Sequence, residues 1–367
     1  MTSMATLAAA TTALLTLAAC TSPAVPAAGT GGHSSSAEAT VQTGADVPDL
    51  VANPHAPATV PATMDVSDVQ TSVTGGDVEA VSLLGRPLLA SDITAPLDAE
   101  TLAERESLLA AAEADYDDDP RQLDHIIWYG RRLAYLGRYR DAIAVYTRGV
   151  MVTQTDRHRI LRHRGHRWIS LRQFDRAIAD LSIAWAMARP MEDRIEADGL
   201  PNATGTPHST TKGNITYHLG LAHFLKGDYE RALAAYEECL ELSRWNDDML
   251  VATTHWTYMT LRRLGRDAEA AALLQDIGPD TEVVENMAYR DLALLRKGLL
   301  QPGDVLAEGD DGIQNATAAF GVANWYLVEG QPERARAIMQ RIVEGSAWPA
   351  FGFLAAEADL ARGIPGE

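Results

Sequence analysis

The sequence predicts an all-α protein in which about five pairs of antiparallel helices stack into a solenoid. Three observations support this prediction. A short glycine–aromatic–alanine pattern recurs after residue 119, two of its four spacings are near 34 residues, and apolar residues follow helical spacing within each recurrence. Before the repeats, the sequence predicts a flexible tether and an extended docking arm.

The bulk composition limits the classes of function. The chain has 367 residues, of which 46% are hydrophobic and 22% charged, as in ordinary soluble domains. A formal net charge of -19 disfavours nucleic acid as a partner, because such binding depends on neutralising phosphates. The two cysteines, Cys20 and Cys239, lie in such different settings that we expect no disulfide between them. We expect Cys239 to be buried and inert.

Residues 1–19 form an apolar leader. The run Met4–Ala19 is too short to span a bilayer comfortably, and it ends in Leu-Ala-Ala before Cys20. This ending resembles the lipobox of bacterial lipoprotein signal peptides, although the leader has no Lys or Arg at its start. The resemblance implies cleavage before Cys20, lipidation of that cysteine with palmitate-type chains, and anchoring to the membrane of a bacterial cell envelope. Because Thr21 rather than Asp follows, it implies the periplasmic face of the outer membrane in a Gram-negative cell. The alternative is a leader whose cysteine is incidental.

The segment that follows changes character twice. Residues 20–65 are rich in Ala, Pro, Thr, Gly and Ser, which predicts a low-complexity tether. Residues 66–118 combine an extended arm and a helix. In Val78–Asp92, glycine and proline interrupt an apolar run, so we expect an arm docked on the folded body. In Asp98–Ala114 we expect a helix with Asp98 as its N-cap.

Residues 119–363 carry the repeats. Their recurring alanines are Ala142, Ala177, Ala232, Ala270 and Ala335. This pattern resembles the tetratricopeptide repeat, a pair of antiparallel helices. The resemblance implies that a glycine ends each first helix and that small residues such as Gly130, Gly165 and Gly220 lie where two helices cross. The five units that we expect are Leu123–Gln154, His158–Arg189, Gly213–Arg244, Val251–Pro279 and Ala316–Gly345.

Three further segments complete the array. Residues 191–212 form a Gly-, Pro-, Asn- and Thr-rich insertion between the second and third units, which predicts a surface loop. Glu282–Gly298 has apolar residues at helical spacing and predicts one helix. Trp348–Arg362 predicts a terminal capping helix, which stacked repeats need.

The resemblance also implies a binding face. In such repeats the first helix of each unit lines the concave side, where its second, fifth, ninth and twelfth positions form one stripe. The stripe is basic near its middle and aromatic further on, and its candidate binding residues are Asp124, Arg131, Arg159, Arg162, His166, Asn214, Tyr217, Phe224, His255, Met259, Arg262 and Asn324.

The arginines of the stripe admit two interpretations. Arginine pairs well with carboxylates, so a basic groove in an acidic protein predicts a protein or peptide partner of acidic character. Alternatively, Arg159 and Arg162 pair with acidic residues of the insertion and hold it down; these are Glu192, Asp193, Glu196 and Asp198. Both interpretations stay open here. Arg164 replaces an apolar residue of the repeat, and we expect an internal ion pair for it, with the insertion as the favoured partner.

The sequence therefore favours a membrane-anchored scaffold that binds a protein or peptide in its concave groove. The alternative is a small-ligand or glycan-binding lipoprotein in which residues 191–212 roof the same groove. No catalytic motif is recognisable, so we expect no enzyme, no cofactor and no catalytic residue. We also expect no metal site, because the histidines near Arg159 lie among guanidinium groups that repel cations.

Overall fold

The computed structural model describes residues 77–200, 202, 204–306 and 313–364 of the chain. The predicted signal peptide 1–19, the lipidation site Cys20 and the predicted tether 20–65 lie outside the described residues. Their predicted roles stay predictions.

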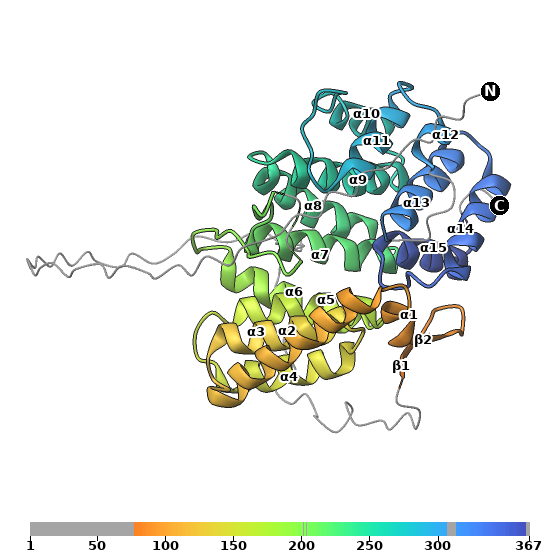
Figure 1. Cartoon of the computed structure of the whole chain (residues 1–367). Coiled ribbons are helices and arrows are strands. Elements are labelled where there is room, and N and C mark those ends of the chain that lie inside the picture. The colour runs from red at the N-terminus through yellow and green to blue at the C-terminus, as the bar shows by residue number, and fades with distance from the viewer. Residues whose placement is uncertain (1–76, 201, 203, 307–312, 365–367) are drawn as a thin grey trace, which may run out of the picture. The chain divides into compact units, whose positions relative to one another are not determined.

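The described part of the chain is almost entirely helical, which confirms the all-α prediction (Figure 1). Fifteen helices and a single pair of short strands are present in it. The strands are β1 (Val78–Val81) and β2 (Pro87–Leu89). The helices are α1 (Ser91–Thr94), α2 (Ala99–Asp118), α3 (Leu123–Tyr135), α4 (Tyr139–Val152), α5 (Arg157–Ser170), α6 (Phe174–Ala188), α7 (Thr211–Lys226), α8 (Tyr229–Ser243), α9 (Asp247–Arg263), α10 (Asp267–Leu273), α11 (Met287–Arg296), α12 (Pro302–Val305), α13 (Ile313–Val328), α14 (Pro332–Glu344) and α15 (Phe351–Arg362).

The helices form the stacked pairs that the repeats predict. The five pairs are α3 with α4, α5 with α6, α7 with α8, α9 with α10, and α13 with α14, and the second helix of each of the first three pairs also packs on the first helix of the next. Helix α11 lies between α9 and α13, where the sequence predicts a single helix. Helix α15 packs on α13 and α14. The stack thus buries one continuous core that runs from pair to pair.

Close approach within each pair depends on a glycine that faces a large side chain. A Cβ atom added to Gly220 would lie 2.6 Å from the ring of Tyr236, and one added to Gly130 would lie 2.4 Å from the ring of Tyr146. Both distances are shorter than any real contact, so only hydrogen at these Cα atoms lets the aromatic ring of the second helix lie flat on the first. These crossings therefore have the geometry that the sequence predicts.

A left-handed residue ends the first helix of each pair. Gly227 has φ 83° after α7, and Gly137 has φ 77° after α3. In the second pair this position is Arg172, with φ 61°. A side chain in this region costs about 1–2 kcal/mol, so an arginine here must be held by other interactions.

The N-terminal arm forms a short antiparallel hairpin rather than a single extended segment. Strands β1 and β2 pair Ala80 with Leu88. The hairpin is docked, as predicted: the carbonyl of Glu79 accepts a hydrogen bond from Arg140 Nε at 2.7 Å, and Arg86 Nη1 donates to the Val343 carbonyl at 2.9 Å. It therefore joins the start of α4 to the end of α14. Helix α2 follows, with its N-cap at Asp98, whose side chain accepts from the Thr101 amide at 2.7 Å.

The last helix returns to the middle of the stack. Helix α15 contacts α7 as well as its own neighbours α13 and α14 (Figure 1). Because α7 is packed by α6, α8, α5, α9 and α15, almost all of its side chains are buried, including polar ones such as Asn214, Thr216 and His218. In a simple solenoid one face of such a first helix would be exposed to solvent, whereas α7 is buried on almost all sides.

A buried ion pair joins this last helix to the second repeat. Arg172 Nη2 lies 2.5 Å from Glu357 Oε2, and neither side chain is more than 3% exposed. The same guanidinium donates to the carbonyls of Ser170 at 2.5 Å and Trp348 at 3.1 Å. Glu357 also accepts from the amide of Leu83 in the hairpin. Three segments that are far apart in sequence meet at these two side chains.

We expect Glu357→Gln to lower the free energy of unfolding by about 3–5 kcal/mol, because it leaves the Arg172 charge buried without a counter-charge. Urea denaturation followed by circular dichroism measures this loss. Glu106→Gln on the exposed face of α2 is the matched control, and we expect it to change the free energy by less than about 0.5 kcal/mol. If Glu357→Gln lowered the free energy of unfolding as little as the control does, the Arg172–Glu357 pair would not contribute to stability as we expect.

Candidate functional site

The predicted stripe comes from helices that pack side by side. Asp124 and Arg131 are on α3, and the remaining residues are on α5, α7, α9 and α13. Helices α3, α5, α7 and α9 contact one another in that order. Asn324 of α13 joins them, because its side-chain oxygen accepts from Arg263 Nη2 of α9 at 3.3 Å. The structure thus brings the twelve residues onto neighbouring helices.

Most of the stripe is buried. Seven of its twelve residues are less than 9% exposed, and these are Arg162, Asn214, Tyr217, Phe224, His255, Met259 and Asn324. The more open residues include Asp124 and Arg159, whose side chains are 51% and 29% exposed. The contacts of the twelve residues with a partner stay predictions. A partner could reach the seven buried residues only if the segments that cover them moved.

The arginines of the stripe already hold carboxylates of the same chain. Arg162 Nη2 lies 2.8 Å from Glu196 of the insertion. Arg159 Nη2 lies 2.7 Å from Asp124 of α3, not from the insertion. Of the two interpretations of the basic cluster, the pairing with the insertion therefore holds for Arg162. Arg159 makes a different internal pair.

Other cations of the first unit hold the insertion by its backbone. Arg131 Nη1 donates to the carbonyl of Ala197 at 2.7 Å, and Arg132 Nη1 donates to that of Gly199 at 3.0 Å. Arg131 also lies 4.6 Å from the ring centre of Trp128. The insertion therefore crosses from α5 to the end of α3, over the basic part of the stripe.

The prediction for Arg164 is right about the ion pair and wrong about the favoured partner. Its Nε and Nη2 each lie 2.7 Å from an oxygen of Asp180, a two-point contact within the second pair. Asp180 is on α6, which packs on α5, whereas the insertion is held by Arg162, two residues earlier on α5. The bidentate geometry favours the nearer, rigid helix over a loop.

His166 and His218 fill the space between α5, α7 and α15, and His163 lies on another side of α5, against Tyr146 of α4. The ring centres of His166 and His218 are 4.2 Å apart, and Phe351 of α15 lies 5.5 Å from the first and 5.6 Å from the second. Burial lowers the pKa of His163, His166 and His218 well below the usual histidine value, and nearby arginines lower it further. The neutral rings make the 3.8 Å approach of His163 to Glu196 a polar contact rather than an ion pair.

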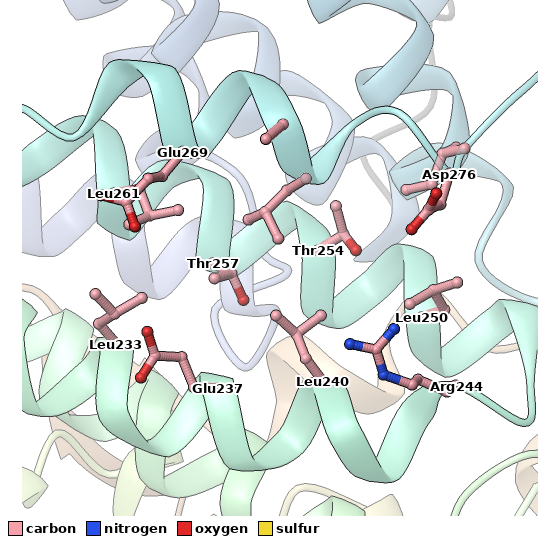
Figure 2. Close-up of a pocket in the computed structure, with 13 residues that line it drawn as sticks. Leu233, Glu237, Leu240, Arg244, Leu250, Thr254, Thr257, Leu261, Glu269 and Asp276 are labelled. Carbon is pink, nitrogen blue, oxygen red and sulfur yellow. The ribbon is translucent and has the colours of Figure 1, made fainter.

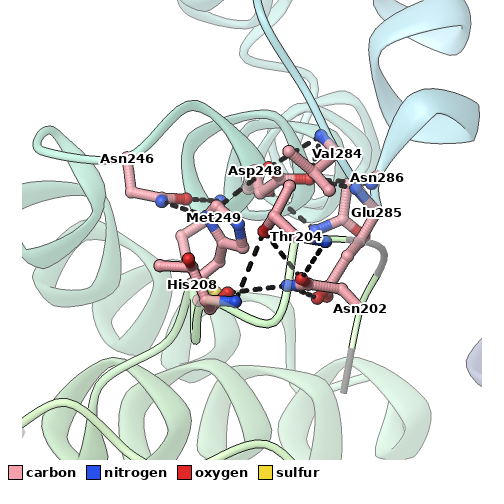
Figure 3. Close-up of polar contacts among 10 residues, drawn as sticks. Asn202, Thr204, His208, Asn246, Asp248, Met249, Val284, Glu285 and Asn286 are labelled. Carbon is pink, nitrogen blue, oxygen red and sulfur yellow. Dashed lines mark hydrogen bonds and ion pairs between the residues drawn. The ribbon is translucent and has the colours of Figure 1, made fainter. Parts of the chain in front are cut away.

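The far end of the insertion is fixed to the start of α9 and to the segment just before α11 (Figure 3). Asn202 Nδ2 donates to Glu285 Oε1 at 2.5 Å, and His208 Nδ1 lies 2.8 Å from Asn246 Nδ2. Beside them, Asp248 is only 2% exposed. Its carboxylate accepts from three successive backbone amides, those of Val284, Glu285 and Asn286, at 3.0, 2.8 and 2.8 Å. The insertion is therefore held at both ends.

No pattern in the sequence marks several of these residues. Asp248 looks like an ordinary acidic residue in the first turn of a helix, where the helix dipole favours it. Phe351 looks like one apolar residue of a capping helix. Their roles depend on segments between about 36 and 185 residues away in the chain, and a single sequence carries no signal for such pairings.

A cleft lies elsewhere on the protein, between α8 and α10 (Figure 2). Helix α9 forms its floor, from Leu250 to Leu261, and its volume is about 360 Å³. The walls carry apolar side chains with carboxylates above them, among them Glu237 of α8 and Asp276 after α10. No sequence pattern marks this cleft, because its residues belong to second helices or to the helix between them.

Two chemical observations concern the described residues alone. No group of three or more His, Cys, Asp and Glu side chains in them converges as a metal site would require. Cys239 is fully buried, as predicted, and burial raises the pKa of its thiol, which keeps it protonated and unreactive at neutral pH.

Comparison with known proteins supports the repeat assignment. The tetratricopeptide repeat family model matches residues 215–246, which cover most of the α7–α8 pair. That pair is therefore a tetratricopeptide repeat, as the sequence pattern predicted. A tetratricopeptide repeat protein from Parabacteroides merdae of known structure is similar over 73% of this chain and 95% of its own, with 13% identity and a TM-score of 0.40. No curated protein matches the chain.

We expect the protein to lose stability as the pH falls below about 6.5, where unfolded histidines bind protons that the buried rings reject. The folded-state pKa values of His166 and His218 are lowered, so the unfolded state binds more protons and acid favours it. Each such histidine contributes a slope of about 1.4 kcal/mol per pH unit in this range. Urea denaturation at pH 7.5 and 5.5 measures the combined slope.

His218→Asn removes one of these titrating groups. We therefore expect the free energy of unfolding of this variant to depend on pH less steeply than that of the unaltered protein, by the contribution of one histidine. An unchanged slope in the variant would mean that His218 does not titrate differently in the folded and unfolded states.

Proposed function

We propose that this protein is a protein-interaction scaffold that a lipid on Cys20 anchors in a bacterial cell envelope. One observation carries the scaffold proposal: a tetratricopeptide repeat at 215–246 lies within a stack of similar helix pairs. Tetratricopeptide repeats generally mediate contacts between proteins, because stacked pairs present extended surfaces. The lipobox at Leu17–Cys20 supports the anchor. None of the helices that the structure describes is long and apolar enough to cross a bilayer.

The partner surface in this proposal lies outside the predicted stripe. An acidic segment could use the stripe only by replacing Glu196 at Arg162 and Asp124 at Arg159. Replacing the buried pair would also release the insertion. Exchanging one carboxylate for another gains little, whereas uncovering a buried arginine is costly. The stripe therefore serves best as an internal framework that holds the insertion and α15.

The glycan or small-ligand alternative shares part of this geometry, because the insertion does cross the stripe as a roof would. The groups that such a ligand would need are engaged, however. Arg131, Arg162 and Asn214 all make hydrogen bonds or ion pairs within the chain. We therefore prefer the scaffold.

Lipidation is tested by labelling. We expect cells that express the full chain to incorporate radiolabelled or alkyne-tagged palmitate into it, and we expect Cys20→Ala to abolish the label and release the protein from membranes. Cys239→Ala serves as the matched control and should keep the label, because that thiol is buried. Equal labelling of both variants would argue against an anchor at Cys20.

The location of the partner surface is tested by capture. We expect Arg159→Glu to recover crosslinked partners from envelope membranes within about twofold of the unaltered chain. The Arg159–Asp124 ion pair that it removes is partly exposed and contributes at most about 1 kcal/mol to stability. Quantitative mass spectrometry after crosslinking of the full chain measures recovery. A loss of about tenfold or more would move the partner surface back to the stripe, and the absence of any specific partner would overturn the scaffold proposal.

A further inference from the structure

Helices α9 and α11 pack through two reciprocal aromatic contacts (Figure 1). Tyr289 of α11 lies on His255 of α9, with the ring centres 4.8 Å apart. Tyr258 of α9 lies on Arg296 of α11, and the Cζ atom of Arg296 is 4.3 Å from the ring centre. Residues three or seven positions apart share one face of a helix. The interface therefore places an imidazole from α9 and a guanidinium from α11 between the same two helices.

The guanidinium of Arg296 is buried without a hydrogen-bond acceptor. Both terminal nitrogens are buried, and neither finds an acceptor in the part of the chain that the structure describes. The ring of Tyr258 attracts the cation, but a contact with a ring centre supplies no lone pair to the N–H donors. Burial lowers the pKa of Arg296 to about 10, because the charged form loses its hydration. The side chain thus carries a charge whose donors the described residues leave unused.

The surrounding helices supply no counter-charge to Arg296. Among the described residues, the only ionisable side chains that interact with it electrostatically are Tyr258 and His255. The acidic residue of α11, Asp291, pairs with Arg290 at 2.9 Å. Helix α13, the other neighbour of α11, has no charged residue in its sequence. The positive charge of Arg296 is therefore uncompensated within the described part of the protein.

His255 presents a second set of unused polar atoms. It is only 1% exposed, and neither ring nitrogen has a hydrogen-bond partner among the described residues. Burial lowers the pKa of His255 well below the usual histidine value, and the charge of Arg296 lowers it further. The ring is therefore neutral and carries one N–H donor. Buried polar groups without partners are costly, so two of them at one interface indicate a ligand that completes their hydrogen bonds.

We propose that Arg296 and His255 bind a small oxyanion, a phosphate or a carboxylate, between α9 and α11. The planar fork of a guanidinium fits two oxygens of such an anion, and the neutral imidazole donates to another. Because the terminal nitrogens of Arg296 are buried, a free ion can reach them more readily than a segment of a partner protein can. The rest of Arg296 is partly exposed, so solvent reaches the edge of the site.

The site goes beyond the scaffold function and does not depend on it. Helix α11 packs on both α9 and α13, so it connects the fourth helix pair to the fifth. An anion that binds the folded chain alone stabilises this connection by mass action. The anion would therefore act as a structural ligand of the second half of the stack.

The first test is isothermal titration calorimetry of the full chain with phosphate, sulfate and acetate in turn, at an ionic strength held constant with sodium chloride. We expect at least one of them to saturate a single site with a Kd of about 0.1–10 mM. Phosphate and sulfate binding ahead of acetate would identify a tetrahedral anion, and the reverse order would identify a carboxylate. The absence of saturable binding by all three overturns the proposal.

The second test assigns binding to Arg296. Arg296→Met keeps an apolar stem and removes every donor, so we expect it to weaken binding of the preferred anion at least about tenfold. Arg244→Met is the matched control: it removes the same charge from an exposed arginine that pairs with Glu241, and it should alter the affinity less than about twofold. An equal loss in both variants would mean that the anion responds only to net charge, and would overturn the proposal.

Thermal unfolding gives a second readout for the same variants. We expect about 50 mM of the preferred anion to raise the Tm of the unaltered chain by at least about 2 °C over sodium chloride of equal ionic strength. In Arg296→Met we expect no such rise, and we expect the Tm in chloride to be no lower than that of the unaltered chain, because a buried unpaired charge has been removed. A rise of equal size in the variant would reflect the general salting effect of the anion and would contradict the site.

The third test concerns His255. His255→Phe keeps a ring against Tyr289 and removes both nitrogens, so we expect the affinity for the preferred anion to fall at least about threefold. Circular dichroism shows that the variant is folded. An unchanged affinity in the folded variant would remove His255 from the site and overturn the two-residue arrangement proposed here.

Discussion

The buried pair of Arg172 and Glu357 is the contact on which the rest of the arrangement depends. It fixes the turn of the second repeat, the last helix and the N-terminal hairpin at one point. Arg172 occupies a left-handed position that glycine fills in the other pairs, and the strain of about 1–2 kcal/mol is offset by five hydrogen-bonded contacts to buried acceptors. If α15 moved, both buried charges would lose their counter-charge, which is costly. The pair therefore holds α15 in one position.

With α15 in that position, most of the predicted stripe is buried in the core. Once α15 lies against α7, Phe351 covers His166 and His218, and the insertion covers Arg131 and Arg162. The polar groups of the stripe then have to be satisfied from within, because buried charges and amides are costly without partners. Because α15 and the insertion cover these groups, the arginines pair with carboxylates of the same chain and the histidines are neutral. The insertion itself is held at both ends.

The sequence by itself determined the helix pairs of the repeats and the position of small residues such as Gly220 at the helix crossings, because these depend on side-chain size and spacing within about 35 residues. The structure showed that Tyr236 is the side chain that Gly220 faces. The sequence also determined the cap at Asp98 and the burial of Cys239. It indicated that Arg162 and Arg164 needed counter-charges. For Arg162 it left the insertion as one of two interpretations, and that one holds, whereas for Arg164 it favoured the wrong partner. The tertiary structure alone decided that Asp180 pairs with Arg164, that Glu357 pairs with Arg172, and that the stripe is covered. The contact of Arg172 with Glu357 joins segments 185 residues apart, for which no local periodicity exists. Asp180 is only 16 residues from Arg164, but the choice between it and the insertion depends on how α6 packs on α5.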